Sequence, residues 1–168
     1  MLNLNIDISH WCNFFDELGV EAETFKKEIS KWMEGIGEEF LDIVKEQIIS
    51  YDAKDTGKLF DSFEKGNDGN VFIISNNGFT LEVGTNIDYA TYVNDGHWTC
   101  EKGSIGRWVP GEWVGNKFNY IPGAKTGMYL KQQWVDGKPY FDEAFQVLEK
   151  LFPDLMEAKF ENLLAKWV

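Results

Sequence analysis

The spacing of hydrophobic positions predicts a long amphipathic helix over residues 22–51. Its apolar side chains recur with a period close to 3.6 residues for about seven turns, which is typical of a helix with one buried face. Gly35 and Gly37 interrupt good helix formers at a cost of about 1 kcal/mol each relative to Ala, so we expect a bend or a close helix contact near them. The apolar positions are Phe25, Ile29, Trp32, Met33, Ile36, Phe40, Ile43, Val44 and Ile48.

After this helix the pattern changes to that of β-structure. The runs "NVFIIS" and "FTLEVG" are separated by "NNG", whose Asn and Gly tolerate the positive φ angles of a tight hairpin. Residues 70–84 are therefore predicted to form a β-hairpin, the first part of a segment that reaches residue 96. The following stretch "IDYATYVNDGH" fits one or two helical turns and an irregular strand equally well, so its structure stays open.

Residues 97–138 form a long insertion rich in Gly and Trp. Within it, "EWVGNKFNY" places Gly115 and Asn116 between two β-prone flanks, which predicts a second hairpin. Segments of this length between regular elements are usually functional or mobile.

The last element predicted is a helix over residues 139–168. Pro139 suits its first turn, and Pro153 lacks a backbone donor, so we expect a kink or a break just before Pro153. The apolar side of this helix comprises Phe141, Phe145, Leu148, Phe152, Leu155, Leu163, Leu164 and Trp167.

This order of elements predicts an α+β fold. A small antiparallel sheet is expected to pack against a long N-terminal helix and a C-terminal helix, with a long, partly β insertion loop. A chain of 168 residues with 43% hydrophobic content supports one sizeable core, so we expect a single domain over residues 1–168. Residues 1–21 are an N-terminal segment without a predicted element.

Charge is unevenly distributed along this acidic chain. The net charge of −12 argues against specific binding of nucleic acid, which requires a basic face for the phosphates. Residues 15–50 carry ten Asp or Glu and four Lys, whereas residues 98–138 carry six Lys or Arg and three Asp or Glu. The two regions are either ordinary solvated faces or complementary surfaces for head-to-tail self-association.

Cysteine content and hydropathy bear on the cellular setting. Two cysteines, Cys12 and Cys100, and the lack of a signal peptide fit a reduced cytosolic setting. The longest apolar stretches are only a few residues, so no membrane span is expected.

The triplet Asp55-Thr56-Gly57 raises the possibility of an aspartic protease. Such an enzyme needs two Asp-containing loops in apolar surroundings, but the chain has one triplet, flanked by charged residues and preceded by a helix. We therefore expect Asp55 or Thr56 to cap a short helical turn, with Gly57 providing backbone freedom at the corner. That turn would present Leu59 and Phe63 to the core.

Two further patterns suggest ligand binding, and neither fits a standard motif. In "PGAKTG" (residues 122–127), Ala124 precedes Lys125 where a phosphate-binding loop requires Gly. His10-x-Cys12 and His97-x-x-Cys100 together offer four zinc-type ligands, but neither spacing is that of a zinc knuckle. We expect no metal and no cofactor, and nothing in the chain points to a catalytic nucleophile with its base.

The aromatic residues of the insertion are consistent with two kinds of binding surface. Trp98, Trp108, Trp113, Trp134, Tyr120 and Tyr129 would serve as a stacking platform for sugars or bases, but core filling and subunit contact explain them more simply. We take the insertion as the segment that reaches a neighbouring copy. Its candidate interface residues are Trp98, Arg107, Trp108, Trp113, Lys117, Tyr120, Lys125 and Trp134.

Three landmarks occur in order along the chain: "AKDTGKLFDSF", "LEVGTNIDYATYVNDGH" and "GKPYFDEAFQVLEK". Together they resemble the gene-product-10-like minor tail-component family of tailed phages, over roughly residues 25–150. Ala53 departs from the family pattern, which has Pro there, and the insertion is longer than in many relatives. The matching positions are Asp55, Thr56, Gly57, Leu59, Ser62, Val83, Gly84, Thr85, Tyr89, Ala90, Tyr92, Val93, Gly96, Pro139 and Tyr140.

This resemblance implies a non-enzymatic structural protein of a phage or prophage. Family members complete the tail or join head to tail, and assemble as a ring, typically sixfold, at the neck or tail end. Expected partners are further copies of the chain and neighbouring head-connector, tail-terminator or tail-tube proteins, with DNA passing through the ring. The protein would be found in the virion, and in the host cytoplasm during assembly. The alternative is a small-molecule or metal-binding module, or a hydrolase using Asp55 or the His and Cys residues.

Overall fold

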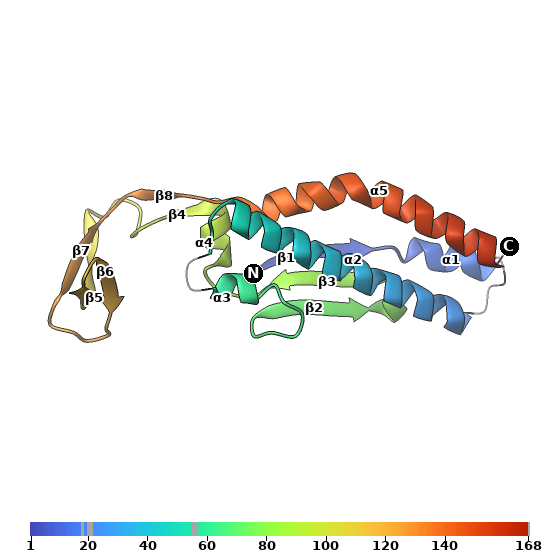
Figure 1. The fold of residues 1–168 in the computed structure, drawn as a ribbon, viewed down its shortest axis with the longest axis horizontal. Coiled ribbons are helices and arrows are strands. Elements are labelled where there is room, and N and C mark those ends of the chain that lie inside the picture. Colours follow the sequence, from blue (N-terminus) through green and yellow to red (C-terminus); the bar gives the residue numbers. More distant parts are fainter. Residues whose placement is uncertain (18, 20–21, 55–56, 168) are drawn as a thin grey trace. The chain divides into compact units, whose positions relative to one another are not determined.

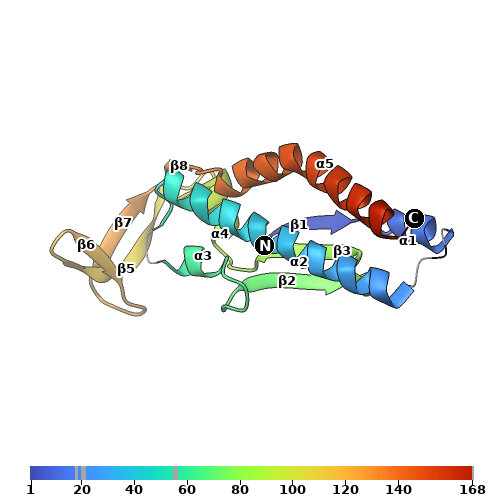
Figure 2. The ribbon, with the colours of Figure 1, turned by 45° about the vertical axis from the view of Figure 1, so that its right-hand side comes forward.

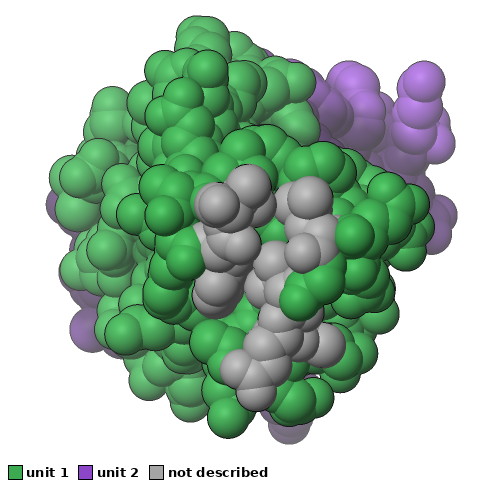
Figure 3. Space-filling model, turned by 90° about the vertical axis from the view of Figure 1, so that its right-hand side faces the viewer, with its two compact units in different colours: residues 1–94, 138–168 green, residues 95–137 purple. Residues whose placement is uncertain are grey.

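The computed structural model describes residues 1–17, 19, 22–54 and 57–167, which belong to two compact units. Unit 1 comprises residues 1–94 and 138–168, and unit 2 comprises residues 95–137; Figure 3 colours them green and purple. The single domain expected over residues 1–168 stays a prediction. The mixed α+β class expected from the sequence is confirmed.

Unit 1 contains a three-stranded antiparallel sheet in the order β1-β3-β2 (Figure 1). The strands are β1 (Leu2–Asp7), β2 (Asn70–Ser75) and β3 (Thr80–Thr85). The predicted hairpin is confirmed as β2 and β3, joined by the short 3-10 turn η1 (Asn76–Gly78), in which Asn76 and Asn77 adopt φ angles of 50° and 55°. Strand β1 was not predicted.

Helix α2 (Ala22–Ser50) packs against this sheet and confirms the long predicted helix. Its predicted apolar stripe is buried, except that Trp32 is only half-buried. A Cβ atom on Gly37 would lie 2.7 Å from the ring of Phe72, so the close contact that we expected near the glycines is with strand β2 and not with another helix. A Cβ atom on Gly35 would meet no atom within 4 Å.

Helix α5 (Tyr140–Trp167) packs along α2, as Figures 1 and 2 show. It continues through Pro153, so the alternative of a break was wrong, although the helix axis changes direction part-way along (Figure 1). Phe145 was predicted to be buried but is 42% exposed, because Phe141, Ala144 and Leu148 occupy the buried face of the helix.

The remaining helices of unit 1 are α1 (His10–Glu17), α3 (Lys58–Asp61) and α4 (Ala90–Asp95). The indole of Trp11 on α1 stacks on Trp32 of α2, with ring centroids 5.9 Å apart. Helix α4 resolves the stretch that the sequence left open. None of the helices in the described ranges is long and apolar enough to cross a membrane.

Unit 2 consists of β-structure. Strands β4 (Gly96–Trp98) and β8 (Trp134–Asp136) pair with each other. Strands β5 (Gly106–Val114), β6 (Lys117–Tyr120) and β7 (Gly127–Lys131) form an antiparallel sheet in the order β6-β5-β7. The second predicted hairpin is thereby confirmed, with Gly115 at a φ angle of 61° in its turn.

Candidate functional site

The first two motif segments meet at a buried pair of hydroxyl groups in unit 1. Ser62 follows α3 and Thr85 ends β3, and their Oγ and Oγ1 atoms lie 2.9 Å apart with both side chains fully buried. The Ser62 hydroxyl donates to the carbonyl of Leu59 at 2.7 Å, and Thr85 Oγ1 accepts the backbone N–H of Ile87 at 3.2 Å. The pair holds the turn around α3 against the end of the sheet.

Further hydrogen bonds complete this network. Thr85 Oγ1 also lies 3.1 Å from the carbonyl of Gly69, and the amide of Asn70 donates to the carbonyl of Ser62 at 3.0 Å. Both hydroxyls are fully buried and donate their hydrogens within the subunit, so they stabilise the fold and are not exposed to a ligand. Ser62 and Thr85 are therefore structural.

The turn that precedes α3 is only partly described. Gly57 adopts a φ angle of 86°, as the corner requires, and Leu59 and Phe63 are buried as predicted. Asp55 and Thr56 lie outside the described residues, so capping by them stays a prediction, and the alternative of a hydrolase that uses Asp55 stays untested.

Two further motif positions allow close approach of the backbone. Val83 is buried in the core. A Cβ atom on the neighbouring Gly84 would collide with the carbonyl oxygen of Leu2, so β1 can pair with β3 only if residue 84 is glycine. Gly96 is equally constrained, because its Cβ atom would lie 2.6 Å from the carbonyl of Val135.

The third landmark begins α5 and is joined to α4 by buried hydrogen bonds. Tyr140, which follows Pro139, is fully buried, and its hydroxyl donates to the carbonyl of Ala90 at 3.1 Å. Asn94 Oδ1 accepts the backbone N–H of Phe141 at 2.9 Å, and Asn94 Nδ2 donates to Asp142 at 2.9 Å. The amide of Asn94 thus satisfies a backbone donor in the first turn of α5.

Sequence reasoning missed Asn94. Its partner Phe141 is 47 positions away, and nothing in the local pattern distinguishes Asn94 from an ordinary exposed residue. One signal could have pointed to such a residue. The backbone N–H groups in the first turn of α5 have no acceptor within the helix and therefore need one from elsewhere in the chain.

Other motif residues face solvent. The side chains of Tyr89 and Tyr92 are 37% and 58% exposed, and Val93 is half-buried. Tyr89 and Val93 line a depression of about 370 Å³ together with Lys54, Gly57 and Leu59. Neither tyrosine belongs to the buried core, so both present part of their rings at the surface.

Unit 2 carries the candidate interface residues on its surface. None of the buried hydrophobic side chains in the described residues belongs to unit 2. Arg107, Lys117 and Lys125 are exposed. The aromatic members of the predicted interface have large exposed fractions: Trp98 44%, Trp108 55%, Trp113 59%, Tyr120 63% and Trp134 47%.

The aromatic side chains of unit 2 are held in place by cross-strand pairs and glycines. Trp108 pairs with Tyr129, and a Cβ atom on Gly127 would lie 2.7 Å from the Trp108 ring. On the opposite face of β5, Trp113 pairs with Phe118, with ring centroids 5.3 Å apart. Cross-strand aromatic pairs stabilise a sheet and here present their rings to solvent.

Ion pairs occupy part of the acidic surface of α2. Lys65 pairs with Glu34 and with Glu38, and the hydrogen bonds that its ammonium group donates to these two carboxylates raise the pKa of Lys65. Lys45 pairs in the same way with Asp42 and Glu64, each at 2.8 Å. These pairs leave unit 1 strongly acidic, with eleven Lys against twenty-four Asp or Glu over residues 1–94 and 138–168.

The other ligand-binding patterns do not form sites among the described residues. His10 and Cys12 belong to unit 1 and His97 and Cys100 to unit 2, and no group of three metal-ligating side chains comes together in the described ranges. Partial burial and the nearby Asp16 carboxylate raise the pKa of Cys12, which makes its thiolate less available to a metal. The "PGAKTG" turn leads into strand β7 and not into a helix.

Comparison with known proteins supports the resemblance. Residues 13–96 match the family described as "Bacteriophage HK97-gp10, putative tail-component". The chain is 45% identical over 142 residues to the phage-like element PBSX protein XkdI of Bacillus subtilis, covering 84% of this chain and 87% of that protein. It is 42% identical over 146 residues to the uncharacterized protein YqbI of B. subtilis, covering 85% of each. No solved structure matches the chain significantly. The chain therefore belongs to the HK97-gp10-like family of phage tail components, and is a structural phage protein.

Proposed function

We propose that this protein completes the tail or joins tail to head, and that it assembles as a ring, typically of six copies, at the neck or tail end. Contacts between copies are made by unit 2 of one copy on unit 1 of the next. Membership of a tail-component family and similarity to a protein of a phage-like element support a virion protein that contacts other phage structural proteins.

The observation that carries this proposal is the exposed aromatic surface of unit 2. A small sheet needs a hydrophobic face packed against something to be stable, and large exposed apolar patches mark interaction sites. The exposed large hydrophobic residues of unit 2 are Trp98, Ile105, Trp108, Trp113, Val114, Tyr120, Ile121, Tyr129, Trp134 and Val135.

Charge supports unit 1 of a neighbouring copy as the surface that covers these residues. Residues 105–131 carry Arg107, Lys117, Lys125 and Lys131 against Glu112 alone, whereas unit 1 is strongly acidic. Contacts between two different patches generate a closed ring when the rotation closes, and opposite charges fix their register. An acidic ring also lets DNA pass without binding it.

The first test measures self-association by light scattering at low and moderate salt. A variant carrying Trp108→Ser and Trp113→Ser should lose the salt-sensitive association of the wild type. Phe145→Ser is the matched control, because Phe145 is an aromatic residue of unit 1 with 42% exposure. Equal association of all three proteins, both free and in assembled particles, would contradict the proposed contact.

The joining role needs a separate test in particles. Phage-like particles produced with the Trp108→Ser and Trp113→Ser variant are expected to contain unjoined heads and tails by electron microscopy. Normal joined particles containing the variant would rule out a role for unit 2 in joining.

A further inference from the structure

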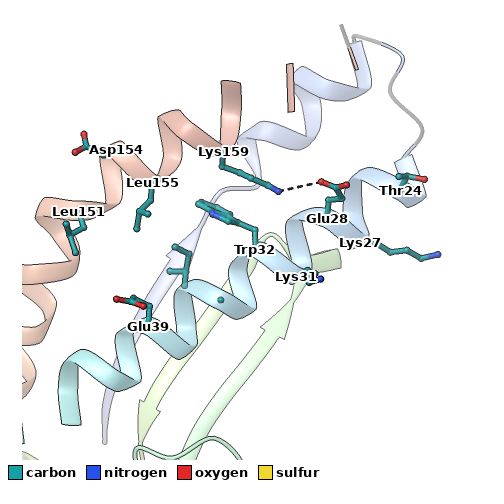
Figure 4. A pocket seen from close by; sticks show the side chains of 12 residues that line it. Thr24, Lys27, Glu28, Lys31, Trp32, Glu39, Leu151, Asp154, Leu155 and Lys159 are labelled. Carbon is teal, nitrogen blue, oxygen red and sulfur yellow. Dashed lines mark ion pairs between the residues drawn. The ribbon is translucent and has the colours of Figure 1, made fainter. Parts of the chain in front are cut away.

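The helix layer of unit 1 is wider than its sheet. A groove of about 990 Å³ separates α2 from α5 and is lined by Trp32 and Gly35 on α2 and by Leu151 on α5 (Figure 4). Strand β1 lies between β3 and α5 in Figures 1 and 2, and it passes behind the groove in Figure 4. Two helices side by side are roughly 20 Å wide, whereas three strands take roughly 14 Å. The helix layer therefore leaves room for one more strand beside β1.

Strands β1 and β2 form the two edges of this sheet, whose order is β1-β3-β2. Both strands have six residues and run antiparallel to β3, so they are parallel to each other. They also lie level, because Leu2 of β1 and Asn70 of β2 both pair with Thr85. The two edges thus match in length, direction and height.

Neither edge has the features that usually prevent pairing with another strand. Soluble proteins protect their edge strands with charged residues, proline, bulges or a covering element. Strand β2 has no charged residue and no proline, its Ile73 is 51% exposed, and β1 has one charged residue, Asp7, at its end. In the described part of the chain, Figures 1 and 2 show beyond β2 only the loop that leads into its first residues. Such an edge is typical of a protein that gains a strand from a partner.

The hydrogen-bond ladder shows which backbone groups of β1 point outward. The N–H of Ile8, next to the end of β1, donates to the carbonyl of Phe79 at 2.9 Å. Every second residue of an antiparallel strand bonds to its neighbour, so the N–H and C=O groups of Asn3, Asn5 and Asp7 point away from β3. The side chains of these three residues lie on the face of the sheet that α2 does not cover.

The same alternation applies to β2. The N–H of Asn86 donates to the carbonyl of Gly69 at 2.9 Å, so Ile73 bonds to β3, and the N–H and C=O groups of Phe72 and Ile74 point outward. The side chains of Phe72 and Ile74 are half-buried against the core, on the helix-covered face. The outward backbone groups of the two edges therefore belong to residues on opposite faces of the sheet.

This difference means that only a parallel pair of β2 with β1 keeps the helices of both copies on one side. In a parallel pair, a residue bonds to the two residues that flank its neighbour. Phe72 of one copy would bond to Asn3 and Asn5 of another. It would lie beside Leu4, whose side chain is also on the helix-covered face. In an antiparallel pair Phe72 would lie opposite Asn5, and the second copy would be turned over.

We propose that β2 of each copy pairs in parallel with β1 of the next copy, so that one continuous sheet closes around the ring. The inference rests on the ring of the proposed function and adds a main-chain contact between neighbouring copies of unit 1. A second copy is the occupant because its β1 edge matches β2 in length, direction and face. Two different edges form a head-to-tail contact, which can close a ring, whereas β2 against β2 gives only a pair of copies.

This arrangement also turns one face of the sheet toward the interior of the ring. The helix layer is wider than the sheet, so it lies outside, where the circumference is larger. The inward face carries Asn5, Asp7 and Glu82, and the three strands contain no Lys or Arg. Such a surface lets DNA pass without binding its phosphates.

The first experiment removes one main-chain donor from the β1 edge. Asn5→Pro deletes an N–H that points away from β3, and edge strands tolerate proline at such positions. Self-association, measured by light scattering, should weaken about tenfold or more, because a hydrogen bond is lost and the pyrrolidine ring obstructs β2 of the next copy. Asn5→Ala keeps the N–H and should associate like the wild type. Thermal unfolding is measured to show that both variants are folded.

The second experiment identifies the occupant by disulfide formation and does not depend on the proline variant. Cys12 and Cys100 are replaced by Ser, and Asn5→Cys and Ile73→Cys, on the same face of the sheet, are introduced into one chain. Within a subunit β3 separates the two positions, whereas adjacent strands of neighbouring copies place them about 5 Å apart, within disulfide range. Oxidation of the concentrated protein and of assembled particles should give a ladder of linked chains from the double variant and none from either single variant.

Two further pairs complete this experiment. Val71→Cys in place of Ile73→Cys covers a register shifted by two residues, because Val71 lies on the same face. Asn5→Cys combined with Ile49→Cys, at a 61% exposed position of α2, is the matched control and should not link.

The outcomes separate this inference from the proposed function. Linked chains from Ile73→Cys alone would show β2 against β2 and overturn it, as would the absence of links from both β1–β2 double variants in assembled particles. If assembly fails on changing Trp108 and Trp113 but tolerates Asn5→Pro without links, the strand contact is overturned and the contact by unit 2 stands. If the links form and Asn5→Pro blocks assembly while the Trp108 and Trp113 changes have no effect, the strand contact stands and the contact by unit 2 fails.

Discussion

Thr85 Oγ1 lies 2.9 Å from Ser62 Oγ, and the two fully buried hydroxyls connect the turn at α3 with the end of strand β3. The residues are 23 positions apart. Their pairing brings together two motif segments that are separate in the sequence, and it gives these positions a structural role.

Removal of the Thr85 hydroxyl should destabilise the protein. Thr85→Val keeps the shape of the side chain but leaves Ser62 Oγ and the N–H of Ile87 with one partner fewer, so we expect a loss of about 1–3 kcal/mol in the free energy of unfolding. Urea unfolding measures the loss, and Thr80→Val on the same strand is the control, expected to stay within about 0.5 kcal/mol. A smaller effect of Thr85→Val than of the control would show that the pair does not hold the turn.

The Asn94 side chain is predicted to stabilise the protein by about as much as a helix-capping residue does. Asn94→Ala removes the acceptor for the Phe141 N–H and should lower the free energy of unfolding by about 1–2 kcal/mol. The exposed Asn5 gives the control variant Asn5→Ala. Equal stability of the two variants in thermal unfolding would exclude Asn94 as a stabilising contact to α5.

Replacing each of the two glycines of α2 by alanine should change the free energy of unfolding in opposite directions. Gly35→Ala is expected to raise the free energy of unfolding by about 0.5–1 kcal/mol, because the helix gains a better former without a clash. Gly37→Ala should lower it by about 1–3 kcal/mol, because the new methyl group overlaps the Phe72 ring. Adding Phe72→Leu to Gly37→Ala should recover part of the loss; no recovery would mean that the ring is not the cause.

Glu28 makes a small contribution to stability that depends on pH. Its hydrogen bond with Lys166, aided by the charge of Lys159, lowers the pKa of Glu28 from its ordinary value of 4.5. A lowered pKa in the folded state means that the contribution is complete above pH 4.5 and is lost as the pH falls further. Glu28→Gln should therefore be less stable than wild type at pH 7 by about 0.5 kcal/mol, since the pair is partly exposed, and the difference should shrink in acid. A difference that stays constant with pH would contradict this origin.

Unit 2 should be the first part of the free subunit to be cut by proteases. It contributes no buried hydrophobic side chain, and segments with few buried apolar contacts open with little free energy. Limited digestion with chymotrypsin is expected to cleave residues 98–138 in the free protein and to spare them in the assembled ring. Cleavage at the same rate in both states would mean that assembly does not cover unit 2.

The spacing of apolar and turn residues along the sequence was enough to predict the elements that are specified by residues close together in the chain. Helix α2, the β2–β3 hairpin, the β5–β6 hairpin and the helical character of α5 all follow from apolar spacing and turn residues, and the structure has each of them. The family also followed from the sequence, because its motif positions lie in short segments. The assembly interface was predicted from composition and charge, and it stays a proposal.

Tertiary structure alone decided which distant segments meet. Strand β1 has alternating apolar residues, but only its place beside β3, where Gly84 admits it, makes it part of the sheet. Asn94 and the Ser62–Thr85 pair depend on partners 47 and 23 positions away, which no local pattern encodes. The same holds for Gly35 and Gly37, which have similar sequence surroundings. One contacts a strand and the other borders an open groove, because packing between elements, and not helix propensity, determines what each backbone position faces.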